Sequence, residues 1–390
     1  MTKDIFILGS TGSIGETVLN VLKKNKNKFN VKLLTTNTNV NKIYKQAITF
    51  NVKEVVIFNQ KKYLKNIKKF EKKKIKVFSS IQEALKSNKK KSYLTINAIS
   101  GIDGLEPSLN IIKHTKNLAI ANKESIICGW KLIKKELLKH KTGFIPLDSE
   151  HFSIWSLINN INKNNIEKIF LTASGGPFLN TKLEKIKNIK PKYALKHPNW
   201  KMGKKISIDS ATMMNKIFEV IEAIKIFNIE ASQIGILIHP KSYIHAIVNF
   251  KNGLTKFIAH DTTMEVPIAN AIYFNSNKYK YRSNNFDYDK LNGINFIKPN
   301  LKKFPLLKIL EYKFNNTYLE IIIVSLNDAL VKKYLENKIA YITIHNLMLK
   351  LLKKAYFYKY YSLRPKNIND IKIMVKKVNL YVDKYVENNA

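Results

Sequence analysis

Short runs of apolar residues recur along the first third of the chain, each separated by stretches with helical spacing. The first run, residues 5–8, is continuous, as in a strand buried on both faces of a parallel sheet. Similar runs predict further strands at 31–36, 54–58, 75–78, 93–98 and 118–121. Strands that alternate with helices indicate an α/β domain built on an open parallel sheet.

The pattern changes in the rest of the chain. Strand-like runs are expected at 170–173, 234–238 and 243–250, and an amphipathic helix at 213–227. The last ninety or so residues show helical periodicity instead, which fits a small helical bundle. Its helices are expected at 319–330, 339–355 and 371–385.

A glycine-rich turn, Gly9-Ser-Thr-Gly-Ser-Ile-Gly15, lies between the first strand and a helical stretch at 16–24. Strand, glycine turn and helix form the arrangement in which a dinucleotide's pyrophosphate meets a helix N-terminus. The spacing is G-x-x-G-x-x-G rather than G-x-G-x-x-G, and a tight turn without a ligand is the alternative. Asn37-Thr38-Asn39, after the second strand, lacks the acidic residue of NAD sites and favours NADP.

Composition adds one strong feature, a formal net charge of +40 over 390 residues. A basic surface for nucleic acid or an anionic membrane is one interpretation. We favour a compositional bias of the genome, because Lys, Asn and Ile are all abundant, Arg is almost absent and the lysines are spread over the whole length. The charge would still speed the arrival of a small anionic substrate.

The N-terminus and the cysteine usage concern the compartment. Cys128 is the only cysteine, which excludes an internal disulfide and fits a reducing environment. Met1-Thr2-Lys3-Asp4 leads directly into an apolar run, and no run approaches the roughly 18 residues that span a bilayer. We expect a soluble, cytoplasmic protein without a membrane or nucleic-acid partner.

Acidic, polar and small residues are concentrated between residues 148 and 219. Asp148-Ser149-Glu150 follows an apolar run, and on an extended segment the carboxylates of Asp148 and Glu150 would project to the same side. Two carboxylates without Cys or His partners favour a hard divalent cation, Mg²⁺ or Mn²⁺. A solvated strand end is the alternative interpretation.

Two loops of this segment suggest an anion site and a lid. Ser174-Gly175-Gly176-Pro177 follows a strand and offers a hydroxyl and backbone N–H groups to an anion. His197-Pro-Asn-Trp200 lies in a stretch without periodicity. It is interpreted either as a mobile lid that excludes water on closing or as a loop that its tryptophan anchors to the core.

Polar residues also gather at one edge of the helix expected at 213–227. Asn215, Lys216 and Glu219 share that edge, and Ser210 is expected near the helix start, where free backbone donors suit a phosphate. A surface Lys–Glu pair is the alternative for Lys216 and Glu219, but it leaves Ser210 and Asn215 unexplained.

The strand expected at 118–121 delivers Asn122-Lys-Glu-Ser125 to its carboxyl end, where ligands bind in an open α/β sheet. Helix capping is an alternative explanation for Glu124 and Ser125, though not for Lys123.

Taken together, these motifs resemble the 1-deoxy-D-xylulose 5-phosphate reductoisomerase family in order and spacing over essentially the whole chain. They are Gly9-Ser-Thr-Gly-Ser-Ile-Gly15, Ala121-Asn-Lys-Glu-Ser125, Asp148-Ser-Glu-His151, Ser174-Gly-Gly-Pro-Phe178, His197-Pro-Asn-Trp200 and Ser207-Ile-Asp-Ser-Ala-Thr-Met-Met-Asn-Lys216. The resemblance implies a rearrangement and reduction of 1-deoxy-D-xylulose 5-phosphate to 2-C-methyl-D-erythritol 4-phosphate in the non-mevalonate pathway of isoprenoid synthesis. It implies NADPH and one divalent ion, Mg²⁺ or Mn²⁺, as cofactors and a homodimer joined through the central sheet.

The resemblance also implies roles for individual residues. As metal ligands it indicates Asp148, Glu150 and Glu219, which with Lys123 and His197 make up the catalytic set. For the substrate it indicates Lys123, Ser149, Ser174, His197, Ser210, Asn215, Lys216 and Glu219. For NADPH it indicates Thr11, Gly12, Ser13, Ile14, Asn122, Glu124 and Gly203, to which the strand-end position adds Asn37, Thr38 and Asn39, in place of the Gly-Lys pair usual in the family.

The expected architecture therefore has three domains. They are a Rossmann-like NADPH-binding domain at 1–147, a central α+β catalytic domain with a sheet and lid loop at 148–273, and, after a linker at 274–299, a C-terminal helical domain at 300–390. The alternative enzyme is an NADP-dependent dehydrogenase of a phosphorylated or amino-acid semialdehyde substrate, which would need no metal chelate.

Overall fold

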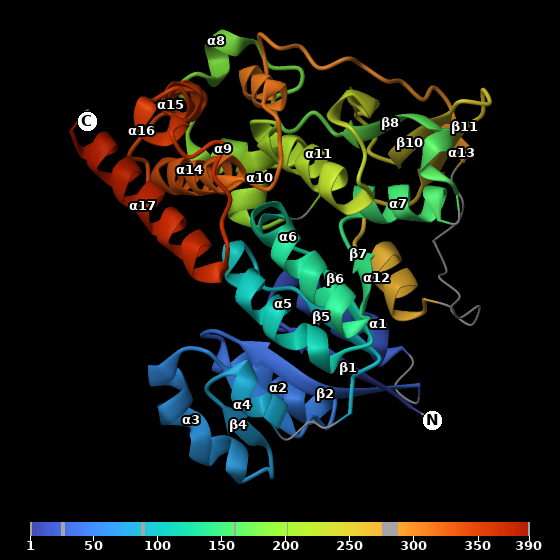
Figure 1. The fold of residues 1–390 in the computed structure, drawn as a ribbon, viewed down its shortest axis with the longest axis vertical. Coiled ribbons are helices and arrows are strands. Elements are labelled where there is room, and N and C mark those ends of the chain that lie inside the picture. The colour runs from blue at the N-terminus through green and yellow to red at the C-terminus, as the bar shows by residue number, and fades with distance from the viewer. Residues whose placement is uncertain are drawn as a thin grey trace. The chain divides into compact units, whose positions relative to one another are not determined.

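The computed structural model describes residues 2–24, 28–86, 90–159, 161–200, 202–274 and 288–388. Its contacts divide the chain into two compact units, whose elements are labelled in Figure 1. The first unit comprises Met1–Ile126, Lys131–Phe152 and Met264–Tyr281, and the second comprises Ile127–Trp130, Ser153–Thr263 and Arg282–Ala390. The expected domain boundaries stay predictions, and residues 275–287, half of the expected linker, lie outside the described residues.

Seven parallel strands form the sheet of the first unit, in the order β4-β3-β2-β1-β5-β6-β7. Its strands are β1 (Lys3–Leu8), β2 (Phe29–Thr36), β3 (Glu54–Ile57), β4 (Lys76–Phe78), β5 (Leu94–Asn97), β6 (Asn117–Ile120) and β7 (Gly143–Pro146). The strand order reverses between β1 and β5, which is the point where an open α/β sheet binds its ligand. The predicted parallel sheet is confirmed.

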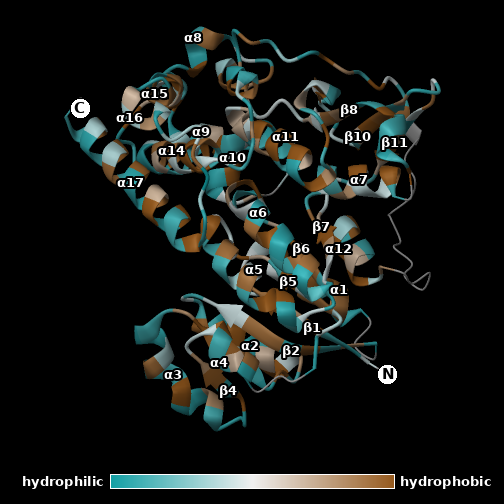
Figure 2. Cartoon of the chain, viewed as in Figure 1, coloured by the Kyte–Doolittle hydropathy of each residue, from teal (hydrophilic) through white to brown (hydrophobic). Residues whose placement is uncertain are grey.

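Helices pack against this sheet and bury an apolar side. They are α1 (Ser13–Lys23), α2 (Val40–Thr49), α3 (Gln60–Glu71), α4 (Ile81–Lys86), α5 (Leu105–Ile111), α6 (Lys123–His140) and α12 (Glu265–Ile272), with short 3₁₀ turns at Ile102–Gly104 and Ile112–His114. Ile5 and Ile7 of β1 share one core with Val18 of α1 and Ile268 of α12. Figure 2 shows polar and apolar residues side by side on these helices, as expected for elements with one buried face.

The second unit contains a four-stranded mixed sheet in the order β11-β10-β8-β9. Its strands are β8 (Ile166–Ala173), β9 (Ile234–Ile238), β10 (Ile244–Phe250) and β11 (Thr255–Ala259). β8 and β9 are parallel, whereas β10 is antiparallel to both β8 and β11. Ile169 and Leu171 of β8 pack with Val220 and Ala223 of the helix that carries the predicted Asn215, Lys216 and Glu219.

Helices make up the rest of this unit. They are α7 (Ser149–Ile158), which begins in the first unit, α8 (Leu183–Ile186), α9 (Pro191–Ala194), α10 (Lys204–Ala211), α11 (Met214–Phe227), α13 (Tyr288–Leu291), α14 (Tyr318–Leu335), α15 (Tyr341–Leu352), α16 (Ala355–Tyr358) and α17 (Ile368–Glu387), with 3₁₀ turns at Lys163–Asn165, Ala231–Gln233 and Pro305–Glu311. α14 contacts α10, α15 and α17 and is buried along most of its length. None of the helices in the described ranges has both the length and the apolar character needed to cross a bilayer.

A buried ion pair joins α11 to α14. Lys225 Nζ lies 2.9 Å from Glu320 Oε1 and 2.9 Å from Asn316 Oδ1, and the side chains of Lys225 and Glu320 are 2% and 0% exposed. Glu320 also accepts from the backbone N–H and hydroxyl of Thr317, and so closes the capping box at the start of α14.

We expect Lys225→Met to lower the free energy of unfolding by about 3–5 kcal/mol, because it leaves the Glu320 carboxylate buried without its cation. Chemical denaturation followed by circular dichroism would measure the change. Lys332→Met, at an exposed position of α14, is the control and should alter stability by less than about 0.5 kcal/mol. Equal effects of the two substitutions would contradict the structural role given to the ion pair.

Candidate functional site

The glycine turn after β1 is too tightly packed for side chains. Gly9 has φ +76°, and a Cβ there would lie 2.9 Å from the backbone of Ala98. A Cβ on Gly15 would lie 2.5 Å from the carbonyl oxygen of Gly9. Helix α1 begins at Ser13, and its N-cap Gly12 has no side chain to occupy the first-turn N–H groups. The turn therefore suits the pyrophosphate of a dinucleotide, with Ser13 and Ile14 at the helix start.

The carboxyl end of β2 lies beside this turn. Thr36 is the last residue of β2, and its Oγ1 lies 2.8 Å from Thr11 Oγ1. Asn37, Thr38 and Asn39 follow and are exposed. Asn39 caps α2 through a 3.3 Å hydrogen bond from the Lys42 N–H.

Lys42, in the first turn of α2, is the cation nearest in sequence to Asn37, Thr38 and Asn39. Its ammonium lies 2.7 Å from Glu16 Oε1, so a 2′-phosphate would compete with this carboxylate for the lysine.

Asn122 lies at the carboxyl end of β6 and caps α6, where its Oδ1 accepts from the Ser125 N–H at 3.0 Å. Its Nδ2 is buried and has no hydrogen-bond partner among the described residues. A buried donor without an acceptor is costly, and a bound cofactor offers acceptors for it. Lys123 and Glu124 form the first turn of α6.

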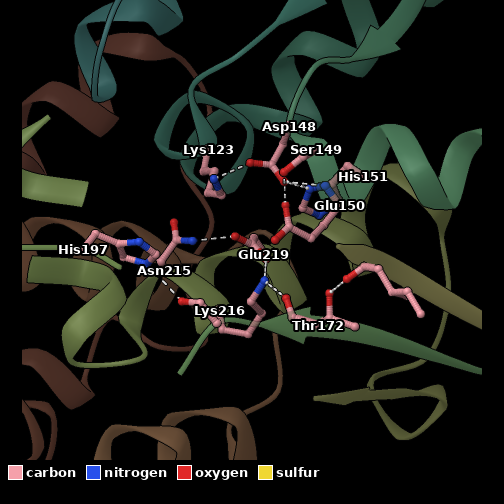
Figure 3. Close-up of polar contacts among 12 residues, drawn as sticks. Lys123, Asp148, Ser149, Glu150, His151, Thr172, His197, Asn215, Lys216 and Glu219 are labelled. Atoms are coloured by element: carbon pink, nitrogen blue, oxygen red, sulfur yellow. Dashed lines mark hydrogen bonds and ion pairs between the residues drawn. The ribbon is translucent and has the colours of Figure 1, made fainter. Parts of the chain in front are cut away.

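A cluster of ionisable groups surrounds Asp148 in the first unit (Figure 3). Its Oδ2 accepts from the buried Lys123 ammonium, and its Oδ1 is 3.1 Å from His151 Nδ1 and accepts from the Glu150 N–H at 3.2 Å. Burial raises the pKa of the Asp148 carboxyl, but the charges and hydrogen bonds of Lys123 and His151 hold this pKa well below its usual range. The group stays ionised and can ligate a cation.

The expected extended conformation of Asp148 to Glu150 is wrong. β7 ends at Pro146, and Ser149 and Glu150 already form the first turn of α7, with the Ser149 hydroxyl donating to the Glu150 carboxylate. The helix starts here because the Asp148 side chain accepts the Glu150 N–H, as a capping residue does.

The sequence did not indicate a role for His151. Its spacing of three residues from Asp148 at a helix start was the available signal.

A second cluster lies in the other unit, where α11 meets the end of β8. Asn215 Nδ2 donates to Glu219 Oε1 at 2.6 Å. The Lys216 ammonium donates both to Glu219 Oε2 and to the carbonyl oxygen of Thr172 (Figure 3). Lys216 and Glu219 are 3% and 1% exposed. The predicted sharing of one helix edge is confirmed by these bonds, whereas the alternative of a surface Lys–Glu pair is wrong.

The Ser174 hydroxyl is oriented by its neighbours. The backbone N–H groups of Asn199 and Trp200 both donate to His197 Nδ1, at 3.2 and 3.0 Å, so the ring proton lies on Nε2. That Nε2–H donates to Ser174 Oγ at 2.9 Å, and Gly176 N–H donates to the same oxygen at 3.1 Å. Since Ser174 Oγ accepts twice, its own proton is left to donate to an anion.

Ser210 lies in the last turn of α10 rather than at the start of α11, so the expectation for its position is wrong. The two helices are separated by Thr212 and Met213, and Met213 has φ +63°. A Cβ on Gly176, whose φ is +68°, would be 2.9 Å from the Ser210 carbonyl oxygen. The glycine thus lets the Ser174 loop approach Ser210 closely.

Gly203 is the exposed N-cap of α10, and, apart from its chain neighbours, no atom of the described residues lies within 4 Å of its Cβ position.

Burial lowers the pKa of His197 to about 4. We therefore expect the imidazole to be neutral throughout the range above about pH 5, and an NMR titration of its ring protons to give a midpoint well below 6.5. In the unfolded chain this histidine takes up a proton near pH 6.5, so stability should fall as pH drops from 6.5 towards 4. A midpoint at or above 6.5 would contradict this environment.

Comparisons with known proteins agree over nearly the whole chain. Models of the 1-deoxy-D-xylulose 5-phosphate reductoisomerase family match residues 5–129, 144–227 for its C-terminal domain and 261–379 for a further C-terminal domain. A reductoisomerase of that name from Pelagibacter ubique is 53% identical over 384 residues, covering 97% of this chain and 98% of its own.

Solved structures agree as well. A DOX-P reductoisomerase in complex with NADPH, fosmidomycin and magnesium aligns with a TM-score of 0.91 at 29% identity, over 99% of this chain and 98% of its own. The Zymomonas mobilis enzyme in complex with NADPH gives a TM-score of 0.89 at 29% identity, over 99% and 100%. The chain therefore belongs to the 1-deoxy-D-xylulose 5-phosphate reductoisomerase family.

Proposed function

We propose that the chain catalyses the reaction of its family, the NADPH- and divalent-metal-dependent conversion of 1-deoxy-D-xylulose 5-phosphate to 2-C-methyl-D-erythritol 4-phosphate in the non-mevalonate isoprenoid pathway. Family membership over the whole length supports this function. The observation that carries it is the ionised, buried Asp148 beside the Glu150 carboxylate, with a second carboxylate cluster at Glu219.

The metal would be held by Asp148, Glu150 and Glu219. These side chains offer oxygen donors without sulfur or imidazole, which suits Mg²⁺ or Mn²⁺. Lys123 and Lys216 lie beside Asp148 and Glu219, and their positive charges offset the cost of burying these carboxylates. When bound, the ion polarises the substrate carbonyl and NADPH supplies hydride.

The substrate phosphate would be held by groups of the second unit. Ser174 has a hydroxyl proton to donate, and it lies on the loop that Gly176 brings against Ser210. Asn215 and Lys216 add an amide and an ammonium, whose geometry Glu219 fixes. Lys123 and Ser149 would bind the substrate from the other cluster, and the neutral His197 would close the loop above it and keep water out.

NADPH would lie along the carboxyl ends of the strands of the first unit. Thr11, Gly12, Ser13 and Ile14 would contact the pyrophosphate at the start of α1, and Asn122, through its unpaired Nδ2, would supply a donor together with Glu124. Gly203 would complete this site. The exposed Asn37, Thr38 and Asn39 would accommodate the 2′-phosphate without an acidic residue to repel it.

We further propose that the enzyme is a cytoplasmic homodimer without nucleic-acid or membrane partners, joined through the mixed sheet. β11 is an edge strand of that sheet, and edge strands favour pairing with another chain. Leu254 and Phe257, at this edge, are 56% and 50% exposed. A second copy would cover them.

Turnover can be tested with 1-deoxy-D-xylulose 5-phosphate, NADPH and Mg²⁺, followed at the absorbance of the reduced nicotinamide. We expect turnover that a chelator abolishes and that Glu219→Gln reduces by roughly a hundredfold or more, because the variant loses a ligand charge. Glu222→Gln, one turn further along α11, is the control. Turnover that is insensitive to chelator would refute the metal assignment, and a rate with NADH equal to that with NADPH would refute the NADP preference.

Light scattering after size-exclusion chromatography tests the dimer. We expect twice the chain mass for the wild type and the chain mass for Phe257→Asp, because a charge in an apolar contact is costly to desolvate. Ile373→Asp, at a residue of α17 that is 64% exposed, should leave the mass unchanged. A wild-type monomer would contradict the homodimer.

A further inference from the structure

The end of α10 is held on both sides of Ser210 by the C-terminal helices. Asn327 of α14 donates from Nδ2 to Asp209 Oδ1 at 2.8 Å, in a buried hydrogen bond. Tyr341 of α15 donates from its hydroxyl to the Ala211 carbonyl oxygen, also at 2.8 Å and buried. Asp209 and Ala211 are the two chain neighbours of Ser210, so these bonds fix the backbone that presents its hydroxyl.

The Asp209 carboxylate takes part in the polar contacts between α10 and α14. Its side chain is 3% exposed, and its Oδ2 lies 3.0 Å from the Lys205 ammonium, one turn earlier in α10. That ammonium also lies 2.9 Å from Asp328 Oδ1 of α14. Asn327 therefore binds the Asp209 carboxylate and Asp328 binds the Lys205 ammonium, so two adjacent residues of α14 hold both members of one ion pair of α10. Apolar packing of α14 against α10 would not require these polar contacts.

Tyr341 also reaches the other side of the proposed phosphate site. Its ring stacks edge-on against Phe178, with centroids 5.4 Å apart. Phe178 follows the loop that carries Ser174, and Gly176 of that loop packs against the Ser210 backbone. One buried side chain of α15 therefore supports both serines that would bind the phosphate.

The corner between α10 and α11 makes this support necessary. Met213 adopts the left-handed conformation, with φ +63°, and is buried. A residue with a side chain keeps this unfavourable conformation only where its surroundings impose it. Asn215 and Lys216 follow within three residues, so the angle of this corner sets their distance from Ser210.

We propose that Asn327 and Tyr341 are positioning residues, which fix Ser210 relative to Ser174, Asn215 and Lys216 and thereby set the affinity for the substrate phosphate. This inference rests on the proposed role of Ser210 as a phosphate ligand. It gives the C-terminal helices a role in positioning the phosphate-binding residues, although their sequence predicts only a helical bundle.

Three variants test the proposal in the full-length protein. Tyr341→Phe removes one hydroxyl and keeps the ring contacts. Asn327→Asp places a second carboxylate against Asp209. The double variant Asn327→Asp/Asp209→Asn exchanges the two side chains, so that the amide at position 209 donates to the carboxylate at position 327. Ile323→Val is the matched control, since it removes a buried methyl group from α14 and leaves the polar groups of Asn327 and Tyr341 in place.

Two measurements separate positioning from simple stabilisation. The first is the set of steady-state constants for the sugar phosphate and for NADPH, and the second is the affinity for inorganic phosphate by calorimetry without substrate. We expect Tyr341→Phe and Asn327→Asp to raise the KM for the sugar phosphate and weaken phosphate binding roughly three- to tenfold. The KM for NADPH should be unchanged, and the exchanged pair should recover to within about twofold.

The outcomes are distinguishable. If both single variants lower only the melting temperature, as Ile323→Val should, the inference is overturned while wild-type turnover still supports the enzyme's function. If the wild type shows no turnover but phosphate affinity falls in the variants, the proposed reaction fails and the positioning role stands. If Asn327→Asp does not fold, Tyr341→Phe decides, because loss of one hydroxyl preserves the packing.

Discussion

The burial of Lys216 together with Glu219 is the constraint on which the second unit depends. An ammonium in the protein interior is tolerated only with partners, and this one donates both to the Glu219 carboxylate and to the Thr172 carbonyl oxygen. The bond to Thr172 ties the start of α11 to the end of β8. Apolar packing of Val220 and Ala223 against the same strand orients the helix but cannot alone set its position along the strand.

The first unit also contains a buried carboxylate that is neutralised by a buried lysine. Asp148 follows β7 and is neutralised by Lys123, which lies in the first turn of α6. His151, near the start of α7, contacts the other oxygen of this carboxylate through its Nδ1. In both units a buried carboxylate is paired with one lysine, and a residue nearby in the sequence, Glu150 or Asn215, donates a hydrogen bond to that carboxylate.

Periodicity was enough to predict the strands that are buried on both faces. The runs 5–8 and 118–121 are apolar throughout because both faces of the parallel sheet are covered, and β1 and β6 lie where expected. It failed where a side chain decides between conformations. The Asp148 side chain caps α7, which begins at the next residue. The turn at Met213 separates α10 from α11. Residues near Ser210 in space, such as Asn327 and Tyr341, are separated from Asp209 and Ala211 by 118 and 130 positions, a distance that no local pattern can bridge.

The scarcity of arginine gives these contacts a particular form. The cation is lysine in each of the buried or half-buried ion pairs at Asp148, Asp209, Glu219 and Glu320. An ammonium is a point charge with three donors and can bridge acceptors that lie in different directions. Lys216 bridges a carbonyl and a carboxylate, and Lys225 an amide and a carboxylate. A planar guanidinium would favour two oxygens of one carboxylate, so replacing these lysines by arginine would keep the charge and lose the connection between elements.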